Sequence, residues 1–249
     1  TASGWRRPEW RFQVVGTPVR QGAPVTDSSA APPTRPALLV LASTYPRWRD
    51  DPEPSFVHEL CRRLASRFEV IVLCPHAIGA LPHESMDGVE ILRYRYAPER
   101  WERLVNDGGI VGNLRRHRWM IALVPSFVLM QAWHAWRLAR RRPIAVVHAH
   151  WLIPQGAIAA ALQLLLRRPL PYVVTSHGAD LYALRARPVV ALKKWVLKRA
   201  EGVTVVSSAM RNMVTKLCSA SGSVSVLPMG VDLAGRFVPG EPGQRNENE

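Results

Sequence analysis

The most constraining feature of this sequence is an alternation of short apolar runs with longer segments of helical periodicity. Seven runs of four or five residues are predicted strands: residues 38–42, 70–73, 89–92, 144–148, 172–175, 203–206 and 224–227. Apolar strands separated by helices are typical of a parallel sheet covered on both faces. Because crossovers between parallel strands are right-handed, the pattern predicts an α/β fold with one doubly wound, Rossmann-like sheet of six or seven parallel strands.

Four segments between the predicted strands carry helix signals. In residues 55–68, apolar side chains recur at helical spacing and arginines share the opposite face. Pro154 opens a second apolar helix, Pro188 suits the first turn of a third, and Ser207 or Ser208 can cap a fourth. Each helix joins two predicted strands, as a doubly wound sheet requires.

Composition and patterning divide the chain into three parts. Its 249 residues, 47% of them apolar, are enough for one sizeable core, which excludes collagen-like and disulfide-stapled classes. Residues 1–36 are rich in Pro, Ser, Ala and Arg without periodicity, which predicts a flexible leader. Residues 240–249 have no apolar side chain to bury and are predicted to be a disordered tail. The globular domain is therefore expected over 37–239.

The cysteines and the N-terminus predict a cytoplasmic location. Cys61, Cys74 and Cys218 are odd in number and far apart, a usage that fits a reducing compartment better than a disulfide framework or a zinc site. The opening residues, TASGWRRPEWRF, contain no apolar run behind their charges, so they do not resemble a secretory signal.

Basic residues outnumber acidic ones by 33 to 19, which allows nucleic acid, anionic lipid or phosphorylated substrates as partners. The longest apolar stretch, residues 119–136, includes Pro125 and several polar side chains and is too interrupted to span a bilayer. We expect residues 119–142 to be helical, bent near Pro125 and partly exposed. Arginines on both sides would suit a membrane surface, whereas a buried helix with a polar face remains the alternative.

The loop after the first predicted strand, STYPRWRDDPEPS, leads into a helix N-terminus. It contains no GxGxxG, so a dinucleotide site is not supported. Free backbone N–H groups at the helix start, with Arg47 and Arg49 nearby, could hold an anion, although a solvated surface loop explains the same residues.

Histidines follow the fourth and fifth predicted strands. His148 and His150 share one face if the strand continues, and His177 is the one evident third ligand for a metal, without a supporting Cys or carboxylate. Polar lining of a site and structural histidines are the competing interpretations. After the fifth predicted strand, Ser176-His177-Gly178-Ala179-Asp180 places a His and an Asp where they could bind a sugar hydroxyl or move a proton, unless Asp180 only caps a turn. A hydrolase elbow, GxSxG, and a phosphate loop, GKS or GKT, are both missing from the sequence.

Taken together, these motifs resemble the N-terminal half of the retaining family 4 glycosyltransferases, which have the GT-B fold. The matching stretches occur in the family's order over roughly residues 38–239: LASTYPRWRDDPEPSFVHELCRRLA, DGVEILRYRYAPER, NDGGIVGNL, VVHAHWLIPQG, VVTSHGADLY, RAEGVTVVSSAMR and VLPMGVDLAGRFVP. The first loop lacks the Gly-Gly pair that many members have. Met229 stands where many have Asn.

The resemblance implies a division of labour among site residues. His177 corresponds to the family's donor-facing His, with Asp180 beside it, and both are predicted to be catalytic. No metal is expected. The predicted acceptor-binding residues come from the first loop and from the HAHW motif: Tyr45, Arg47, Ser55, Phe56, His150 and Trp151.

The resemblance also implies a function. The expected role is the acceptor-binding half of an enzyme that transfers a hexose from a nucleotide sugar to a lipid-linked or polysaccharide acceptor, on the cytoplasmic side of the membrane in cell-envelope polysaccharide synthesis. The donor-binding C-terminal domain is expected to be absent after residue 239, so the nucleotide sugar would bind only with that domain and the chain alone would be inactive. A basic module that binds a membrane surface or nucleic acid without catalysis is the alternative, although no nucleic-acid-binding motif is evident.

Overall fold

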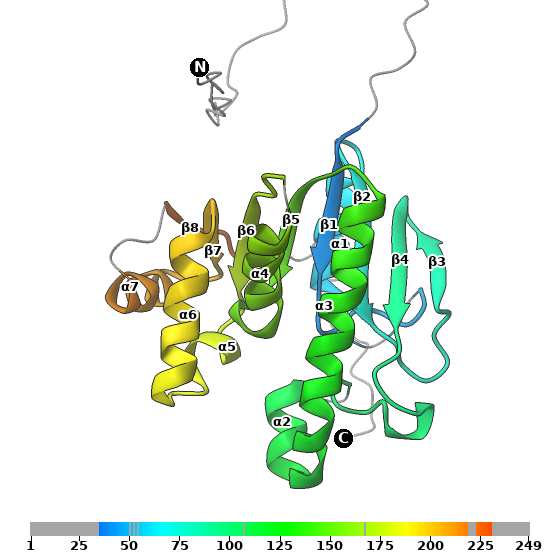
Figure 1. Ribbon diagram of the computed structural model, residues 1–249, viewed down its shortest axis with the longest axis horizontal. Helices are drawn as coiled ribbons and strands as arrows, with labels where there is room; N and C mark the ends of the chain where they lie inside the picture. The colour runs from blue at the N-terminus through cyan, green and yellow to red at the C-terminus, as the bar shows by residue number, and fades with distance from the viewer. Residues whose placement is uncertain are drawn as a thin grey trace, which may run out of the picture. The chain divides into compact units, whose positions relative to one another are not determined.

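The computed structural model describes residues 35–230 except 50, 52, 54, 107, 167 and 219–222. The predicted tail and all but the last two residues of the predicted leader lie outside these ranges. Among the described residues, eight strands form one sheet in the order β3-β4-β2-β1-β5-β6-β7-β8 (Figure 1). The strands are β1 Ala37–Leu41, β2 Glu69–Pro75, β3 His83–Met86, β4 Val89–Tyr94, β5 Ile144–His150, β6 Tyr172–Ser176, β7 Gly202–Val205 and β8 Val224–Val226.

The strand order confirms the predicted doubly wound fold. From the central β1, the chain first moves toward β2 and β4, then returns to β5 on the other side and continues to β8. Apart from β3, all strands of the sheet run parallel to one another, and each of these seven lies within two residues of its predicted range. The direction of winding reverses between β1 and β5, and ligands of such sheets bind at this point, beyond the carboxyl ends of the strands.

The sequence-based prediction missed β3, which pairs antiparallel with β4 at the edge of the sheet. Three of its four residues, HESM, are polar and at least partly accessible, so no apolar run marks them. The hairpin turn is formed by Asp87 and Gly88, both with positive φ, 49° and 78°. Asp-Gly is a favoured pair for such a turn, so the signal for this hairpin was the dipeptide rather than the strand.

Helices cover the two faces of the sheet unequally. One core lies under α3, α4, α6 and α7, and a smaller core lies under α1 on the opposite face. The α-helices are α1 Phe56–Leu64, α2 Gly109–Arg116, α3 Val124–Arg141, α4 Ala157–Leu165, α5 Ala179–Tyr182, α6 Arg187–Arg199 and α7 Ser208–Leu217. Shorter turns are η1 Glu99–Trp101, η2 Arg118–Leu123 and η3 Leu152–Gly156.

The four predicted helices are all present, with differences at their ends. The first is shorter than 55–68, because α1 ends at Leu64. Pro188 lies in the first turn of α6, and the Ser207 hydroxyl accepts a hydrogen bond from the Met210 N–H at 3.4 Å, which caps α7 as predicted. Pro154 lies in the irregular η3, and the regular helix α4 begins only at Ala157.

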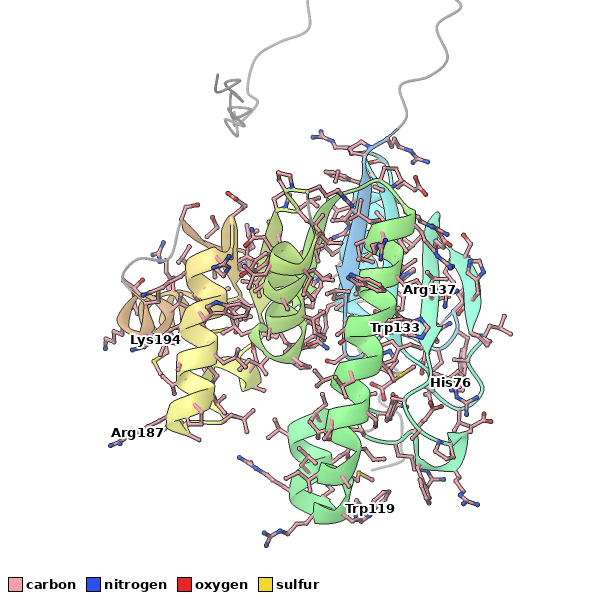
Figure 2. The ribbon with its side chains drawn as sticks, viewed as in Figure 1. His76, Trp119, Trp133, Arg137, Arg187 and Lys194 are labelled. Atoms are coloured by element: carbon pink, nitrogen blue, oxygen red, sulfur yellow. The ribbon has the colours of Figure 1, made fainter. Side chains whose placement is uncertain are left out.

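The predicted helical stretch 119–142 changes type at its proline. It is a 3₁₀ turn over η2 and becomes α-helical in α3, where Pro125 occupies the first turn. Part of its apolar surface is exposed, including Trp119 and Trp133 (Figure 2). No helix among the described residues combines the length and apolar character needed to cross a bilayer.

Candidate functional site

Aromatic and imidazole rings meet at the carboxyl edge of the sheet, where β5, β6 and α1 come together. The His177 ring lies 4.8 Å from Phe56, 4.9 Å from Trp151 and 5.3 Å from His150, measured between ring centroids. His148, two residues before His150 on the same face of β5, extends the group. Its ring centroid lies 4.3 Å from that of His150. We call the three histidines, with Phe56 and Trp151, the imidazole cluster.

Local backbone geometry positions these rings. The alternation of side chains along β5 places His148 and His150 on the α1 side of the sheet. Trp151 then adopts a φ of 77°, uncommon for a residue with a Cβ, and its N–H donates to the Thr175 carbonyl at 2.7 Å. Phe56, at the start of α1, reaches the cluster from the opposite side. The fold therefore brings together residues that are more than a hundred positions apart in the sequence.

Burial keeps the three imidazoles uncharged. Burial lowers the pKa of His148 and of His177 to about 4, and the His148 imidazole adds to the lowering at His177. The pKa of His150 falls well below its usual range because of burial, reinforced by both neighbouring histidines. Nδ1 of His150 and Nε2 of His177 share a hydrogen bond of 3.0 Å. At neutral pH these side chains can donate or accept hydrogen bonds but carry no charge.

Each of the three imidazole rings has a hydrogen bond at one of its nitrogens. His148 Nε2 is hydrogen-bonded to the Thr175 hydroxyl at 2.7 Å, whereas Nε2 of His150 is buried without a partner among the described residues. Within the described ranges, no group of three or more His, Cys, Asp and Glu side chains is arranged to hold a metal ion. The open hydrogen-bonding capacity is therefore that of a neutral imidazole.

Asp180, which the sequence predicted to be catalytic together with His177, lies directly behind the cluster and is buried. Its Oδ2 accepts from the Leu152 N–H at 2.7 Å, and its Oδ1 accepts from the Ser176 hydroxyl and from the N–H groups of His177 and Gly178 at 3.0 to 3.2 Å. Burial raises its pKa against the lowering effect of these donors. The carboxylate therefore ties the turn after β6, which carries His177, to the turn after β5.

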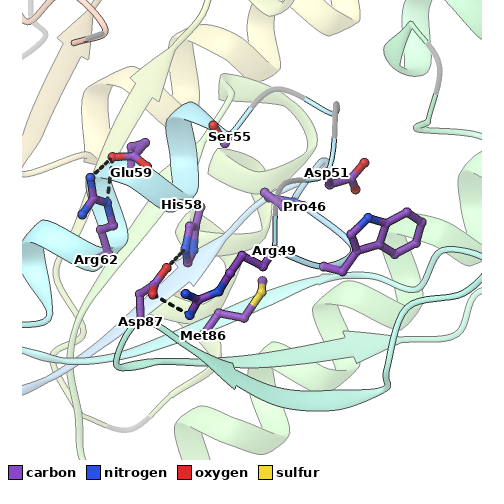
Figure 3. A pocket seen from close by; sticks show the side chains of 10 residues that line it. Pro46, Arg49, Asp51, Ser55, His58, Glu59, Arg62, Met86 and Asp87 are labelled. Carbon is purple, nitrogen blue, oxygen red and sulfur yellow. Dashed lines mark hydrogen bonds and ion pairs between the residues drawn. The ribbon is translucent and has the colours of Figure 1, made fainter. Parts of the chain in front are cut away.

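A second feature lies on the other side of the α1 N-terminus. It is a polar pocket of about 200 Å³ between the β1–α1 loop, α1 and the β3–β4 turn (Figure 3). Its charged lining includes Arg49, Asp51, Glu59, Arg62 and Asp87, with Trp48 and Ser55 beside them. We call it the ion-paired pocket, because its acidic and basic side chains contact one another.

One chain of hydrogen bonds crosses this pocket and continues into the core. Arg49 pairs with Oδ1 of Asp87 at 3.0 Å, and Oδ2 of Asp87 shares a bond of 2.9 Å with Nε2 of His58 (Figure 3). Nδ1 of His58 is 2.7 Å from the Tyr45 hydroxyl. Tyr45 is buried, and burial raises its pKa far above the usual range. Its hydroxyl faces His58 rather than the carboxyl edge.

Arg47 and Asp51 brace the β1–α1 loop. The guanidinium contacts both carboxylate oxygens, at 2.8 Å from Nε and 2.7 Å from the terminal nitrogen, and it stacks on the Trp48 ring at 4.5 Å. Hydrogen bonds from Arg47 lower the pKa of Asp51 to about 2. Two nitrogens of the Arg47 side chain thus bind a carboxylate of the same loop.

The structure separates the predicted site residues into two groups. Phe56, His150, Trp151 and His177 meet in the imidazole cluster, with Asp180 behind them. Ser55 lines the ion-paired pocket, and Tyr45 and Arg47 support the same loop from within. Sequence reasoning missed His58 and Asp87, which link the pocket to Tyr45. The Asp-Gly pair at the hairpin turn was the available signal for Asp87, and nothing local marked His58 as its partner.

Comparison with protein families identifies a relationship over most of the chain. Residues 55–234 match the family model described as Glycosyltransferase Family 4. Among curated proteins, none matches the sequence at the threshold of the comparison.

Solved structures share the fold at low sequence identity. A sucrose-phosphate synthase structure from Thermosynechococcus elongatus superposes with a TM-score of 0.51 and 16% identity, covering 80% of this chain and 91% of that one. The N-terminal domain of Candida albicans trehalose-6-phosphate phosphatase has a TM-score of 0.52 and 12% identity, and the match covers 83% of this chain and 51% of that one. At these identities, the likeness concerns the fold alone.

Proposed function

Because the chain belongs to glycosyltransferase family 4, we propose that residues 37–239 are the acceptor-binding half of an enzyme that transfers a hexose from a nucleotide sugar to a glycan. The observation that carries this proposal is the imidazole cluster at the carboxyl edge, where ligands of doubly wound sheets bind. Aromatic faces offer apolar contact to a sugar ring, and neutral imidazoles exchange hydrogen bonds with hydroxyl groups.

Within this proposal, His177 contacts the transferred sugar and is the catalytic residue of this half. His177 is half-buried, whereas His150 is buried and His148 is bonded to Thr175. Phe56 and Trp151 form the apolar wall beside it. With a pKa of about 4, His177 acts as a neutral hydrogen-bonding group at pH 7 rather than as a proton donor.

The loop residues have a supporting role in acceptor binding. Ser55 lines the ion-paired pocket, whereas Arg47 keeps the loop in place through Asp51. Tyr45 contributes through His58 and not by direct contact. The pocket's carboxylates and guanidinium groups are suited to the hydroxyls of a polysaccharide or lipid-linked acceptor, the acceptor class that we propose.

Transfer requires a donor held next to this acceptor. Bringing two reactants together in one cleft supplies much of the rate of such a reaction, and charged groups at the leaving diphosphate supply more. We therefore propose that a second α/β domain binds the nucleotide sugar. Without that domain, residues 37–239 are not expected to catalyse sugar transfer. The peripheral, cytoplasmic location that a lipid-linked acceptor would require is part of the same proposal.

Replacing His177 tests the assignment. In a preparation assembled with a donor-binding domain, His177→Ala is expected to lower turnover roughly 100-fold, the usual effect of removing a hydrogen bond that forms with developing charge. Its melting temperature should stay close to the parent value, because the ring is partly exposed. His83→Ala, which removes an exposed histidine on β3, is the matched control and should keep full activity.

The opposite result would mark His177 as structural. Turnover per folded molecule would then be retained, while the melting temperature fell.

A further inference from the structure

The net positive charge of this protein comes from one stretch of sequence. Residues 108–200 contain 15 Lys and Arg residues and one acidic residue, Asp180, which is buried. The remaining residues contain 18 basic and 18 acidic side chains, so the formal net charge of +14 belongs entirely to this stretch. A charge distribution as one-sided as this creates a directional field around the molecule.

The fold collects this stretch on one side of the sheet. Its helices α2, α3, α4 and α6 pack on the larger core, opposite α1 (Figure 1). Arg137 on α3 and Arg187 and Lys194 on α6 project from this side (Figure 2). Among the described residues of the stretch, Arg142 is the one that forms ion pairs, with Glu69 and Glu90. No carboxylate among the described residues therefore forms an ion pair with the outward basic side chains.

Large apolar side chains are exposed on the same side. Leu129 and Trp133 lie one helical turn apart on α3, with exposed fractions of 67% and 51%, and Arg137 follows one turn later. Trp133 packs against Trp136 with ring centroids 5.2 Å apart, and the Arg140 guanidinium covers Trp136 at 4.9 Å. Trp119 on η2 and Leu164 and Leu165 on α4 are also more than half exposed.

We propose that this basic helical face, represented by Trp119, Leu129, Trp133, Arg137, Arg140 and Lys194, docks on a bilayer that contains anionic phospholipids. Tryptophan and leucine insert at the boundary between headgroups and acyl chains, and arginine and lysine around them are attracted to lipid phosphates. The combination of the two kinds of side chain on one face is what a lipid surface satisfies.

Other occupants fit less well. A second copy of the chain would bring two faces of the same charge together in a symmetric dimer. A nucleic acid would match the charge, but its phosphate backbone makes no apolar contact that would cover Leu129, Leu164 and Leu165. Anionic lipid accounts for the charge and for the apolar groups together.

The purpose of this contact rests on the proposed function, because membrane docking would bring the site to a lipid-linked acceptor. Vesicle binding is measured without any sugar, so it can succeed or fail independently of sugar transfer.

Vesicle flotation of the full chain tests the proposal. The chain is expected to bind phosphatidylcholine vesicles that contain phosphatidylglycerol, to bind pure phosphatidylcholine much more weakly, and to be released by salt. Neutralising Arg137 and Arg140 together, as Arg137→Gln and Arg140→Gln, should weaken binding about 30-fold, since each basic residue near an anionic surface contributes about 1 kcal/mol, or roughly fivefold. Leu129→Ser with Trp133→Ser should weaken it roughly tenfold or more.

The matched control is a second arginine–tryptophan pair outside the basic stretch. Arg100 stacks on the exposed Trp101 at 5.0 Å, as Arg140 stacks on Trp136. Arg100→Gln with Trp101→Ser should leave vesicle binding unchanged. Urea unfolding of each variant separates lost binding from lost folding, and because the replaced side chains are accessible, all variants should remain folded.

Three results would overturn the proposal. Equal binding to neutral and anionic vesicles would remove the electrostatic part, and equal binding by the parent and the face variants would place the contact elsewhere. A nucleic acid duplex bound through Arg137 and Arg140, with no binding to vesicles, would make the face a nucleic-acid surface.

Discussion

The two sides of the α1 N-terminus accommodate polar groups in opposite ways. In the imidazole cluster, burial lowers the pKa of the histidines and leaves them uncharged, whereas in the ion-paired pocket acidic and basic side chains form ion pairs. The difference shows which side can bind an uncharged ligand without rearrangement. The cluster offers neutral hydrogen-bonding groups, and the pocket must first exchange its ion pairs for ligand contacts.

Lowering the pH should produce the largest effect, a loss of stability that comes from the imidazole cluster. His148 and His177 have folded pKa values of about 4, below the value of about 6.5 expected in the unfolded chain, so the unfolded state binds more protons between these limits. The free energy of unfolding should therefore fall by several kcal/mol, on the order of 1.4 kcal/mol per unit of each pKa difference, as pH drops from 6.5 to 4. Urea unfolding at pH 7, 5.5 and 4 measures this slope, and a flat profile would contradict it.

Removing Asp180 should produce the next largest effect. Asp180→Ala leaves the Leu152, His177 and Gly178 N–H groups and the Ser176 hydroxyl without their acceptor, which should lower the free energy of unfolding by about 3 kcal/mol. Asp180→Asn keeps one acceptor oxygen and should lose less. Equal stability of both variants and the parent in urea would show that the turn does not depend on this carboxylate.

Asp51 should respond to acid in a lower window. Its folded pKa of about 2 lies below the ordinary value of 3.8, so its contribution is fully present above pH 4 and is lost as pH falls toward 2. The difference corresponds to roughly 2 kcal/mol. Asp51→Asn should lose that amount at pH 7 and show a flatter stability profile below pH 4. A chemical shift titration of the Asp51 carboxyl that gave an ordinary pKa would contradict the prediction.

The smallest effect is expected at the rim of the pocket. Arg49→Ala removes an exposed ion pair with Asp87 and should change the free energy of unfolding by less than about 1 kcal/mol. The effect should shrink further in high salt, because exposed pairs are screened. A larger loss would mean that the bond from Asp87 to His58 depends on Arg49.

The fold could be predicted from the sequence to the extent that burial leaves an apolar pattern. All seven parallel strands carried such a pattern, whereas β3 did not, because an edge strand with mostly polar side chains resembles a loop. The rule that site residues follow strand ends identified His150, Trp151 and His177 correctly as neighbours. It could not show that Tyr45 turns inward, because the partner that holds its hydroxyl, His58, lies 13 residues away on the buried side of α1. Asp180 was identified by position, but its four donors come from two different turns that only the folded chain brings together.

The short antiparallel hairpin at the edge has a consequence for solution behaviour. A long, flat parallel edge strand would expose a row of unpaired backbone groups on which another chain could add a strand. Here β4 is covered by β3, which has only four residues, and Glu84 on β3 is ion-paired with Arg93 across the hairpin. This edge of the sheet is therefore a poor template for strand addition. Concentrated solutions should resist edge-to-edge aggregation on this side of the molecule.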